Sequence, residues 1–306
     1  MKNTLEQIGL SLLEISKKNH SRPEQYWNIN KNYLSSFNEK TLLGKKIAKS
    51  KKVNILCLAR NCEKNLLNSI DLISETRSFF CESSVLIYEN DSTDDTKKLL
   101  KKYDNEYNIV SLDDNEPYLV GMENRRTTNL AKYRNYCLDW VKKHNRNHDY
   151  TIVLDLDADG GFSIDGILNS IFWLNNLPQA GGIGSYSLCI ELNQGKLNIA
   201  HYDSFAARLN CWENMGNEWF SCLYLLTGSD PFLMNSCFGG LGIYKTESYL
   251  SGFYEGWDCE HVTFHKNLCK NNWKIYLNPG SRFGSVIKID DYNLLSLYTK
   301  KFYGWQ

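Results

Sequence analysis

The sequence lacks several features that would assign it to a broad protein class. No apolar run among its 306 residues reaches the roughly 20 residues needed to cross a bilayer. The amino terminus has a polar interruption every few residues and no small-residue cleavage site, so it does not resemble a secretory signal. None of the ten cysteines falls in a Cys-x-x-Cys pair, and a chain of this length needs no disulfide framework. We therefore expect free thiols in a reducing compartment and a cytoplasmic location.

Net charge is absent too. Lys plus Arg and Asp plus Glu both total 35, so no basic field marks nucleic acid as a partner. The clearest local excess is a basic run, which consists of Lys45, Lys46, Lys49, Lys51 and Lys52. Such a run predicts a solvated linker, and peripheral contact with an anionic membrane surface is the alternative.

The pattern of apolar residues divides the chain into three regions. Residues 1–50 are expected to form a helical N-terminal extension, with an amphipathic helix over 3–17 and a polar, irregular, basic linker after residue 20. Residues 51–285 alternate between short apolar strands and helical segments, and residues 286–306 form a C-terminal tail. This alternation predicts an α/β fold with a mostly parallel sheet flanked by helices.

The expected elements of the middle region follow from these patterns. Strands are predicted over 53–59, 84–88, 107–112, 182–189, 237–244 and 273–277, with a further one starting at 151. Helices are predicted over 62–74, 97–103, 128–143, 164–174 and 260–270. Residues 195–235 are rich in Tyr, Trp, Phe and Asn, which favours an irregular recognition region.

The run Thr151–Gly161, TIVLDLDADGG, places three acidic residues directly after a short apolar segment. Its first four residues suit that strand, and Asp155, Asp157 and Asp159 follow at alternate positions, which would put all three on one face. Acids this close repel one another unless some are protonated or a cation lies between them. Oxygen ligands favour Mg²⁺ or Mn²⁺, which usually also hold substrate phosphates. A divalent-metal site is the hypothesis, and a strand end with solvated acids is the alternative.

Five segments resemble the nucleotide-sugar glycosyltransferases of the GT-A fold. They are LARN at 58–61, ENDSTDDT at 89–96, AKYRN at 131–135, LDAD at 156–159, and the run from FGGLG at 238 to NP at 279. The resemblance covers roughly residues 53 to 280. Within that superfamily, YDSFAAR at 202–208 and SCFGG at 236–240 are similar to fungal capsule-associated α-mannosyltransferases, the Cap59-like group.

The resemblance implies a GT-A, Rossmann-like fold with an irregular acceptor-side region. Residues 51–162 would form the nucleotide-binding half and residues 163–285 the acceptor half. The implied activity is metal-dependent transfer of a hexose from a GDP- or UDP-sugar to a hydroxyl of a glycan, lipid or protein, as in polysaccharide biosynthesis. LDAD matches the Asp-x-Asp motif, so the resemblance gives Mn²⁺ or Mg²⁺ to Asp157 and Asp159.

The other site residues follow from the same matches and from their chemistry. Nucleotide-sugar binding is expected of Arg60, Glu89, Arg134 and Asp155, and acceptor binding of Asp203, Arg208 and Trp257. Simpler structural roles compete with several of these. Glu89 could satisfy local backbone amides in its turn, Arg134 could be a surface helix charge, and Trp257 could pack in the core.

Glu260, His261 and His265 begin the helix expected over 260–270. The two histidines are one turn apart, a spacing that metal sites use. A zinc-protease reading fails, because Val262 stands where that motif requires Glu. Glu260 or His261 could be the base that deprotonates the acceptor, His265 could be a further metal ligand, and either histidine could be a buried, hydrogen-bonded side chain. Most relatives have an acidic pair where this chain has Glu260-His261, so the base stays open between these two residues.

Two other functions compete with glycosyl transfer. An aspartyl phosphatase also has a strand ending in Asp-x-Asp, although a Thr or Val normally follows two residues after the second Asp, where this chain has Asp159. Three strand–helix units also precede the motif here, whereas the motif comes early in that family. The second alternative is a catalytically silent relative that binds sugars or nucleotides.

Overall fold

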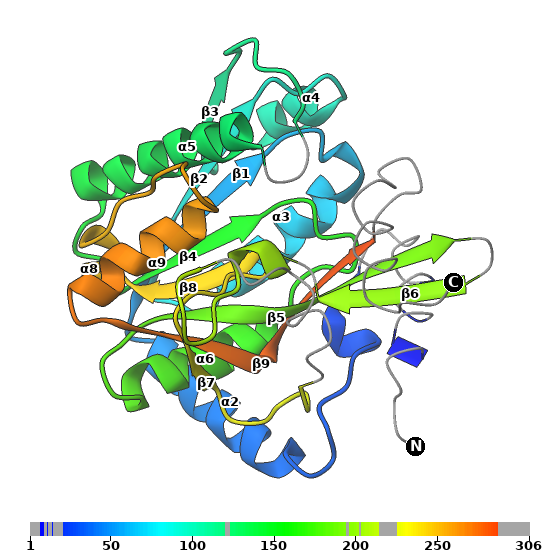
Figure 1. The fold of residues 1–306 in the computed structure, drawn as a ribbon, viewed down its shortest axis with the longest axis vertical. Helices are drawn as coiled ribbons and strands as arrows, with labels where there is room; N and C mark the ends of the chain where they lie inside the picture. Colours follow the sequence, from blue (N-terminus) through cyan, green and yellow to red (C-terminus); the bar gives the residue numbers. More distant parts are fainter. Residues whose placement is uncertain are drawn as a thin grey trace.

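Strands and helices alternate along the chain and build one mixed sheet with helices on both faces (Figure 1). The computed structural model describes residues 7, 8, 11, 14, 21–119, 123–193, 196–201, 203–213 and 225–286. The strands lie in the order β3-β2-β1-β4-β8-β5-β9-β7, and β6 pairs with β5 outside this path. The predicted α/β class is confirmed.

The first half of the sheet is parallel. It contains β1 (Lys52–Ala59), β2 (Glu82–Asn90), β3 (Asn108–Leu112) and β4 (Tyr150–Asp155). The connections carry α3 (Glu63–Arg77), α4 (Thr96–Leu100), η2 (Lys101–Tyr103) and α5 (Asn124–His144). Leu58 of β1 pairs with both Tyr88 of β2 and Asp155 of β4, so the carboxyl ends of these three strands meet at one edge.

The second half mixes parallel and antiparallel pairs. After α6 (Ile164–Asn176) it contains β5 (Ala180–Asn193), β6 (Lys196–His201), η3 (Ser204–Ala206), β7 (Phe232–Met234), β8 (Leu241–Lys245), α8 (Thr246–Leu250), α9 (Glu260–Lys270) and β9 (Lys274–Val286). Strand β8 is antiparallel to β4 and β5, whereas β5 and β9 are parallel. The region expected to be irregular, 195–235, therefore contains β6, η3 and β7, and its residues 195, 202 and 214–224 lie outside the described part.

Strand side chains alternate between two hydrophobic cores. Leu56 of β1 and Val153 of β4 join the core that also contains side chains of α5 and α9. Ile55, Ile152 and Leu154 point the other way, into the core shared with α3 and α6. This two-residue period is why these short apolar runs form strands buried on both faces.

The expectation of an irregular linker after residue 20 is wrong for most of that segment. It contains η1 (Pro23–Gln25) and α2 (Leu34–Ala48), and α2 packs against α6. The contact is close at Gly44, because a Cβ added there would lie 1.8 Å from the carbonyl oxygen of Leu168. The packed face of α2 includes small residues such as Gly44 and Ala48, so its apolar periodicity is weak in the sequence.

Both ends of the chain lie largely outside the description. Residues 7, 8, 11 and 14 are helical, but most of the helix predicted over 3–17 and residues 287–306 of the predicted tail are not described. Within the described ranges, no helix is long and apolar enough to span a membrane. The eight cysteines whose side chains are described are free thiols, as expected, and the cellular compartment stays a prediction.

Candidate active site

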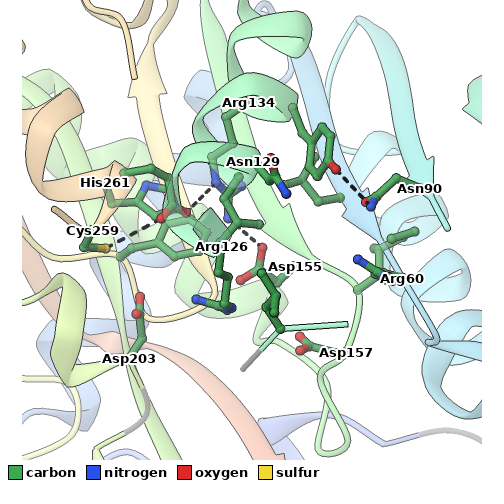
Figure 2. A pocket seen from close by; sticks show the side chains of 18 of the residues that line it. Arg60, Asn90, Arg126, Asn129, Arg134, Asp155, Asp157, Asp203, Cys259 and His261 are labelled. Carbon is green, nitrogen blue, oxygen red and sulfur yellow. Dashed lines mark hydrogen bonds and ion pairs between the residues drawn. The ribbon is translucent and has the colours of Figure 1, made fainter. Parts of the chain in front are cut away.

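A pocket opens at the carboxyl ends of β1 and β4, where open α/β sheets bind ligands. One face of α5, the segment around residue 203 and the start of α9 complete its wall. The polar residues that line it are Arg60, Asn90, Arg126, Asn129, Arg134, Asp155, Asp157, Asp203, Glu260 and His261, most of which Figure 2 labels. Strands and helices from both halves of the sheet therefore contribute to one site.

The acidic run does not continue the strand. Strand β4 ends at Asp155, and Asp157 and Asp159 lie in the turn that follows. The expectation that three acids share one strand face is therefore wrong. Asp155 and Asp157 line the pocket, whereas Asp159 is 9% exposed and lies outside the lining. Its Oδ1 accepts a hydrogen bond from Nζ of Lys64 at 2.7 Å.

The two pocket acids of this run, Asp155 and Asp157, hold a proton more tightly than free carboxyls do, because the pKa of each is raised. Asp157 is exposed to the pocket, but the walls restrict its hydration, and this effect together with the charges of Asp155 and Asp159 raises its pKa to about 7. Burial also raises the pKa of Asp155, although Arg134 opposes the shift. A cation placed between these carboxylates would relieve their repulsion.

The donor set fits a divalent ion only in part. The carboxylate of Asp157 makes no hydrogen bond or ion pair with any described side chain, whereas its backbone carbonyl accepts the amide of Asn65 at 3.2 Å. Asp155 has one oxygen, Oδ1, on Arg134. Within the described ranges, no three His, Cys, Asp or Glu side chains form a ready metal-binding group. Mg²⁺ and Mn²⁺ commonly take one or two carboxylates and complete their shell with water and substrate phosphates. Two carboxylates are thus enough for an ion that arrives with a phosphorylated ligand.

Arg134 holds the two sides of the pocket together. Its Nη2 donates to Oδ1 of Asp155 at 2.9 Å, and its Nε donates to Oε1 of Glu260 at 3.0 Å. The side chain is 5% exposed and lies 5.0 Å from the ring centre of Phe238. Arg134 is therefore a buried bridge between β4 and α9 and not the surface helix charge that was the alternative.

Glu260 and His261 both line the pocket but are deeply buried. Oε1 of Glu260 bonds to Arg134, and its Oε2 accepts a weak hydrogen bond from the Cys259 thiol at 3.8 Å. The His261 ring stacks on Phe238 at 3.6 Å, and its two nitrogens are buried without a hydrogen-bond partner. Burial and then the charge of Arg134 lower the pKa of His261 well below its usual value, so the ring stays neutral.

Asp203 lies on another part of the wall. It precedes η3, has a left-handed backbone with φ of 62°, and its Oδ2 accepts the N–H of Gly239 at 3.1 Å. Restricted hydration, followed by the charges of Glu260 and Asp155, raises its pKa to about 8. Asp203 thus lines the pocket, and its predicted acceptor-binding role stays a prediction.

Arg60 and Arg126 supply positive charge near the acids. Arg60 donates to the carbonyl oxygens of Glu116 and Pro117, which fixes it at the rim beside a loop. Arg126 was not predicted. It lies two turns before Arg134 on α5, and residues 126, 129, 130, 133 and 134 all line the pocket at helical spacing. That spacing is the signal by which the sequence could have revealed Arg126.

Glu89 has the structural role that was its alternative. Its side chain is fully buried and absent from the pocket lining. Oε1 accepts the backbone N–H of Ser92 at 2.8 Å, and Oε2 accepts the hydroxyl of Ser111. The next residue, Asn90, faces the pocket instead, and its amide donates to the hydroxyl of Tyr133 at 3.3 Å.

Besides Asp159 and Glu89, three more predicted site residues lie outside the pocket lining. Arg208 is 2% exposed, and its Nη2 donates to both carboxylate oxygens of Asp258 at 3.1 Å while its Nη1 donates to backbone carbonyls, so its guanidinium is not available to an acceptor there. Trp257 is 58% exposed and outside the lining. His265 is fully buried between Ser236 and Tyr244, each 2.8 Å from one ring nitrogen, and burial lowers its pKa to about 3. No ring nitrogen of His265 is left for a metal, so we withdraw that assignment.

Comparison with known proteins finds similarity in the fold and none in the sequence. No protein-family model and no curated protein sequence matches the chain. Its structure is similar to mannosyltransferase PcManGT from Pyrobaculum calidifontis, in complex with GDP-Man and Mn²⁺, with TM-score 0.51 and 13% identity over 97% of this chain and 73% of that chain. GalNAc-T7, solved with UDP, GalNAc and Mn²⁺, has TM-score 0.51 and 12% identity over 91% of this chain. The chain spans 54% of GalNAc-T7. At such identities the likeness establishes architecture, and the chain has the GT-A, Rossmann-like α/β fold of nucleotide-sugar glycosyltransferases.

Proposed function

We propose that the protein is a metal-dependent glycosyltransferase that moves a hexose from a nucleotide-diphosphate sugar to a hydroxyl acceptor. The observation that carries the proposal is the combination in one pocket of Asp155 and Asp157 with Arg60 and Arg126, at the carboxyl ends of the parallel strands. Carboxylates that can share a cation, next to guanidinium groups, suit a diphosphate. The similar solved structures hold GDP-Man, or UDP and GalNAc, with Mn²⁺, which supports a GDP- or UDP-sugar as donor.

The chain's own residues would divide the binding of the donor. Asn90 and Tyr133, which lie at the β2 side of the pocket, would contact the nucleoside. Arg60 and Arg126 would face the diphosphate, and Arg134 would hold Asp155 in position. In this division residues 51–162 form the nucleotide-binding half and residues 163–285 contribute the acceptor side.

A divalent ion, Mn²⁺ or Mg²⁺, would be held by Asp157 with Asp155. When bound, it would neutralise charge that develops on the leaving diphosphate. We no longer favour Asp159 as a ligand, because its carboxylate bonds to Lys64 outside the pocket. This replaces the pairing of Asp157 with Asp159 that the motif match suggested.

The acceptor is proposed to be a hydroxyl of a glycan, lipid or protein, in polysaccharide biosynthesis in the cytoplasm. Peripheral contact with an anionic membrane would suit α2, where Leu42 is 61% exposed beside Lys45, Lys46 and Lys49. These assignments rest on the sequence and on surface character. The aspartyl phosphatase alternative gains no support from the fold comparisons.

Binding of nucleotide provides the first test. We expect GDP or UDP to raise the melting temperature of the protein in the presence of Mn²⁺ and not in its absence. A ligand present at 100 times its Kd adds about 2.7 kcal/mol to the free energy of unfolding. Asp157→Asn should abolish this metal-dependent shift. Asp159→Asn is the matched control, since it changes the same residue type two positions away, and it should keep most of the shift.

Turnover provides the second test. Mass spectrometry of donor hydrolysis across a panel of GDP- and UDP-sugars would identify the sugar and the nucleotide. Nucleotide binding without cleavage of any donor would favour the catalytically silent relative. Hydrolysis of a phosphomonoester, with no response to nucleotides, would favour the phosphatase.

A further inference from the structure

The acidic side chains of the pocket differ in what their carboxylates contact. Glu260 and Asp155 both bond to Arg134, so their charges are held by a buried cation. The Asp203 carboxylate accepts one hydrogen bond, from the N–H of Gly239 to Oδ2. Within the described residues Oδ1 of Asp203 has neither a hydrogen bond nor an ion pair. Asp203 is also partly exposed, whereas Glu260 is 4% exposed.

The backbone fixes Asp203 from two sides. Its carbonyl oxygen accepts the N–H of Ala206 at 3.0 Å in η3, and its carboxylate is anchored to Gly239. Gly239 has φ of 67°, and a Cβ there would lie 2.4 Å from the carbonyl oxygen of Ser185, so this position requires glycine. The carboxylate is thus held at a defined place on the wall, and no cationic side chain of the described residues forms an ion pair with it.

Asp203 lies at the end of the pocket where the reaction would take place. In Figure 2 it is on the side of Cys259 and His261, across from Arg60 and Asn90. A donor with its nucleoside toward Asn90 and its diphosphate beside Asp157 would direct its sugar toward Asp203.

We propose that Asp203 is the catalytic base of the transfer, an inference that rests on the proposed function. The acceptor oxygen forms a bond to the anomeric carbon, and the hydroxyl proton passes to Oδ1 of Asp203. The bond from the anomeric carbon to the diphosphate oxygen breaks, and its electron pair leaves with the nucleoside diphosphate. One displacement of this kind inverts the anomeric configuration.

The two residues first considered as the base fit that role less well. Glu260 bonds to Arg134 and to the Cys259 thiol, so it orients the guanidinium. His261 has both ring nitrogens buried and a pKa lowered well below its usual value, which makes it a weak base. The raised pKa of Asp203 adds support, because proton affinity near the working pH favours general-base catalysis. Among the described residues, the charged groups that act most strongly on Asp203 are Glu260 of α9 and Asp155 of β4, followed by Arg134 of α5.

Azide gives a test that needs no identified acceptor. Hydrolysis of the donor requires deprotonation of water, whereas the azide anion attacks without losing a proton. The donor is whichever of GDP-mannose, UDP-GlcNAc and UDP-GalNAc the wild type hydrolyses fastest with Mn²⁺. Asp203→Asn should lower hydrolysis by about 10²–10⁴-fold. Transfer to sodium azide should stay within about threefold of wild type. Asn tolerates a left-handed backbone and its amide oxygen can accept the Gly239 N–H, so this variant should fold.

The outcomes separate this inference from the proposed function. Unchanged hydrolysis in Asp203→Asn, an equal loss of hydrolysis and azide transfer, or a product of retained configuration would each overturn the role of Asp203 while leaving a glycosyltransferase. A wild type that binds no GDP or UDP and cleaves no donor would overturn both. Asp91→Asn is the matched control, because Asp91 also has positive φ and accepts backbone N–H groups but lies outside the pocket lining. It should keep the wild-type ratio of hydrolysis to azide transfer.

Discussion

Replacing Arg134 by Met should strongly destabilise the protein. The guanidinium bonds to Asp155 at 2.9 Å and to Glu260 at 3.0 Å, and methionine would fill part of its volume without charge. Removing one partner of a buried ion pair costs about 3–5 kcal/mol, because the other charge is left uncompensated. The Glu260 side chain is 5% exposed and that of Asp155 is 22%, so Glu260 should account for most of the loss. We expect the free energy of unfolding to fall by about 3–5 kcal/mol.

The loss should also depend on pH. Burial raises the pKa of Asp155, and Arg134 limits that rise, so removing the guanidinium should raise this pKa further. A carboxyl with a higher pKa in the folded than in the unfolded state binds more protons when folded, and its contribution to stability falls as pH increases. Arg134→Met should therefore lose more stability, relative to wild type, at pH 8 than at pH 5. Adding Glu260→Gln should restore part of the loss, because it removes the more deeply buried of the two orphaned charges.

Urea unfolding followed by tryptophan fluorescence, at pH 5 and pH 8, would measure these differences. Arg125→Met is the control, because Arg125 also lies on α5 and pairs with the carboxylate of Glu116, but its side chain is 61% exposed. That variant should lose at most about 1 kcal/mol. The reasoning fails if Arg134→Met loses less than about 1 kcal/mol, or loses more at pH 5 than at pH 8.

Two further substitutions test the packing of the N-terminal segment. Glu24 accepts the N–H of Ile164 at 2.7 Å, and burial followed by the charge of Asp165 raises its pKa from 4.5 to about 7, so its contribution to stability falls as pH rises through that window. Glu24→Gln keeps a hydrogen-bond acceptor and removes the charge. The melting temperature of this variant, measured relative to wild type, should therefore be higher at pH 8 than at pH 5, and a difference that does not change with pH would contradict this. Gly44→Ala should destabilise by about 1–3 kcal/mol in urea unfolding despite the better helix propensity of alanine, because its Cβ meets the Leu168 carbonyl. Stabilisation would show that α2 and α6 can separate, and the exposed change Ser35→Ala on α2 is the control.

The parallel half of the fold could be read from the sequence because its strands are short, apolar and separated by helical segments. Strand β4 shows where that reading stops. The spacing of Asp155, Asp157 and Asp159 fits a strand, but the strand ends at the first of them. A period of two in three residues cannot distinguish a strand from a turn, and Gly160 and Gly161 gave only an approximate end.

The site could be predicted as a set of acids and arginines but not as a set of contacts. Glu89, Arg208 and His265 were expected in the site, yet each is satisfied by partners elsewhere. Sequence patterns identify polar residues near strand ends, whereas the partner that satisfies a buried polar group depends on tertiary packing. Arg126 was missed for a different reason. It belongs to none of the matched motifs, and only its position on the same face of α5 as Arg134 indicates that it lines the pocket.

The balance of charge in the pocket explains why binding of a metal and nucleotide should change the stability of the folded protein. Arg134 compensates two of the carboxyls, Asp155 and Glu260, at the cost of burying its own guanidinium and Glu260, whereas the Asp155 side chain stays 22% exposed. Asp157 and Asp203 have no such partner among the described side chains, and restricted hydration raises the pKa of both. Proton uptake is one way to remove their charge, and a divalent cation beside Asp157 is another. Mn²⁺ with a nucleotide should therefore stabilise the protein more at pH 8, where Asp157 is ionised, than at pH 5, where protons compete with the metal for its carboxylate.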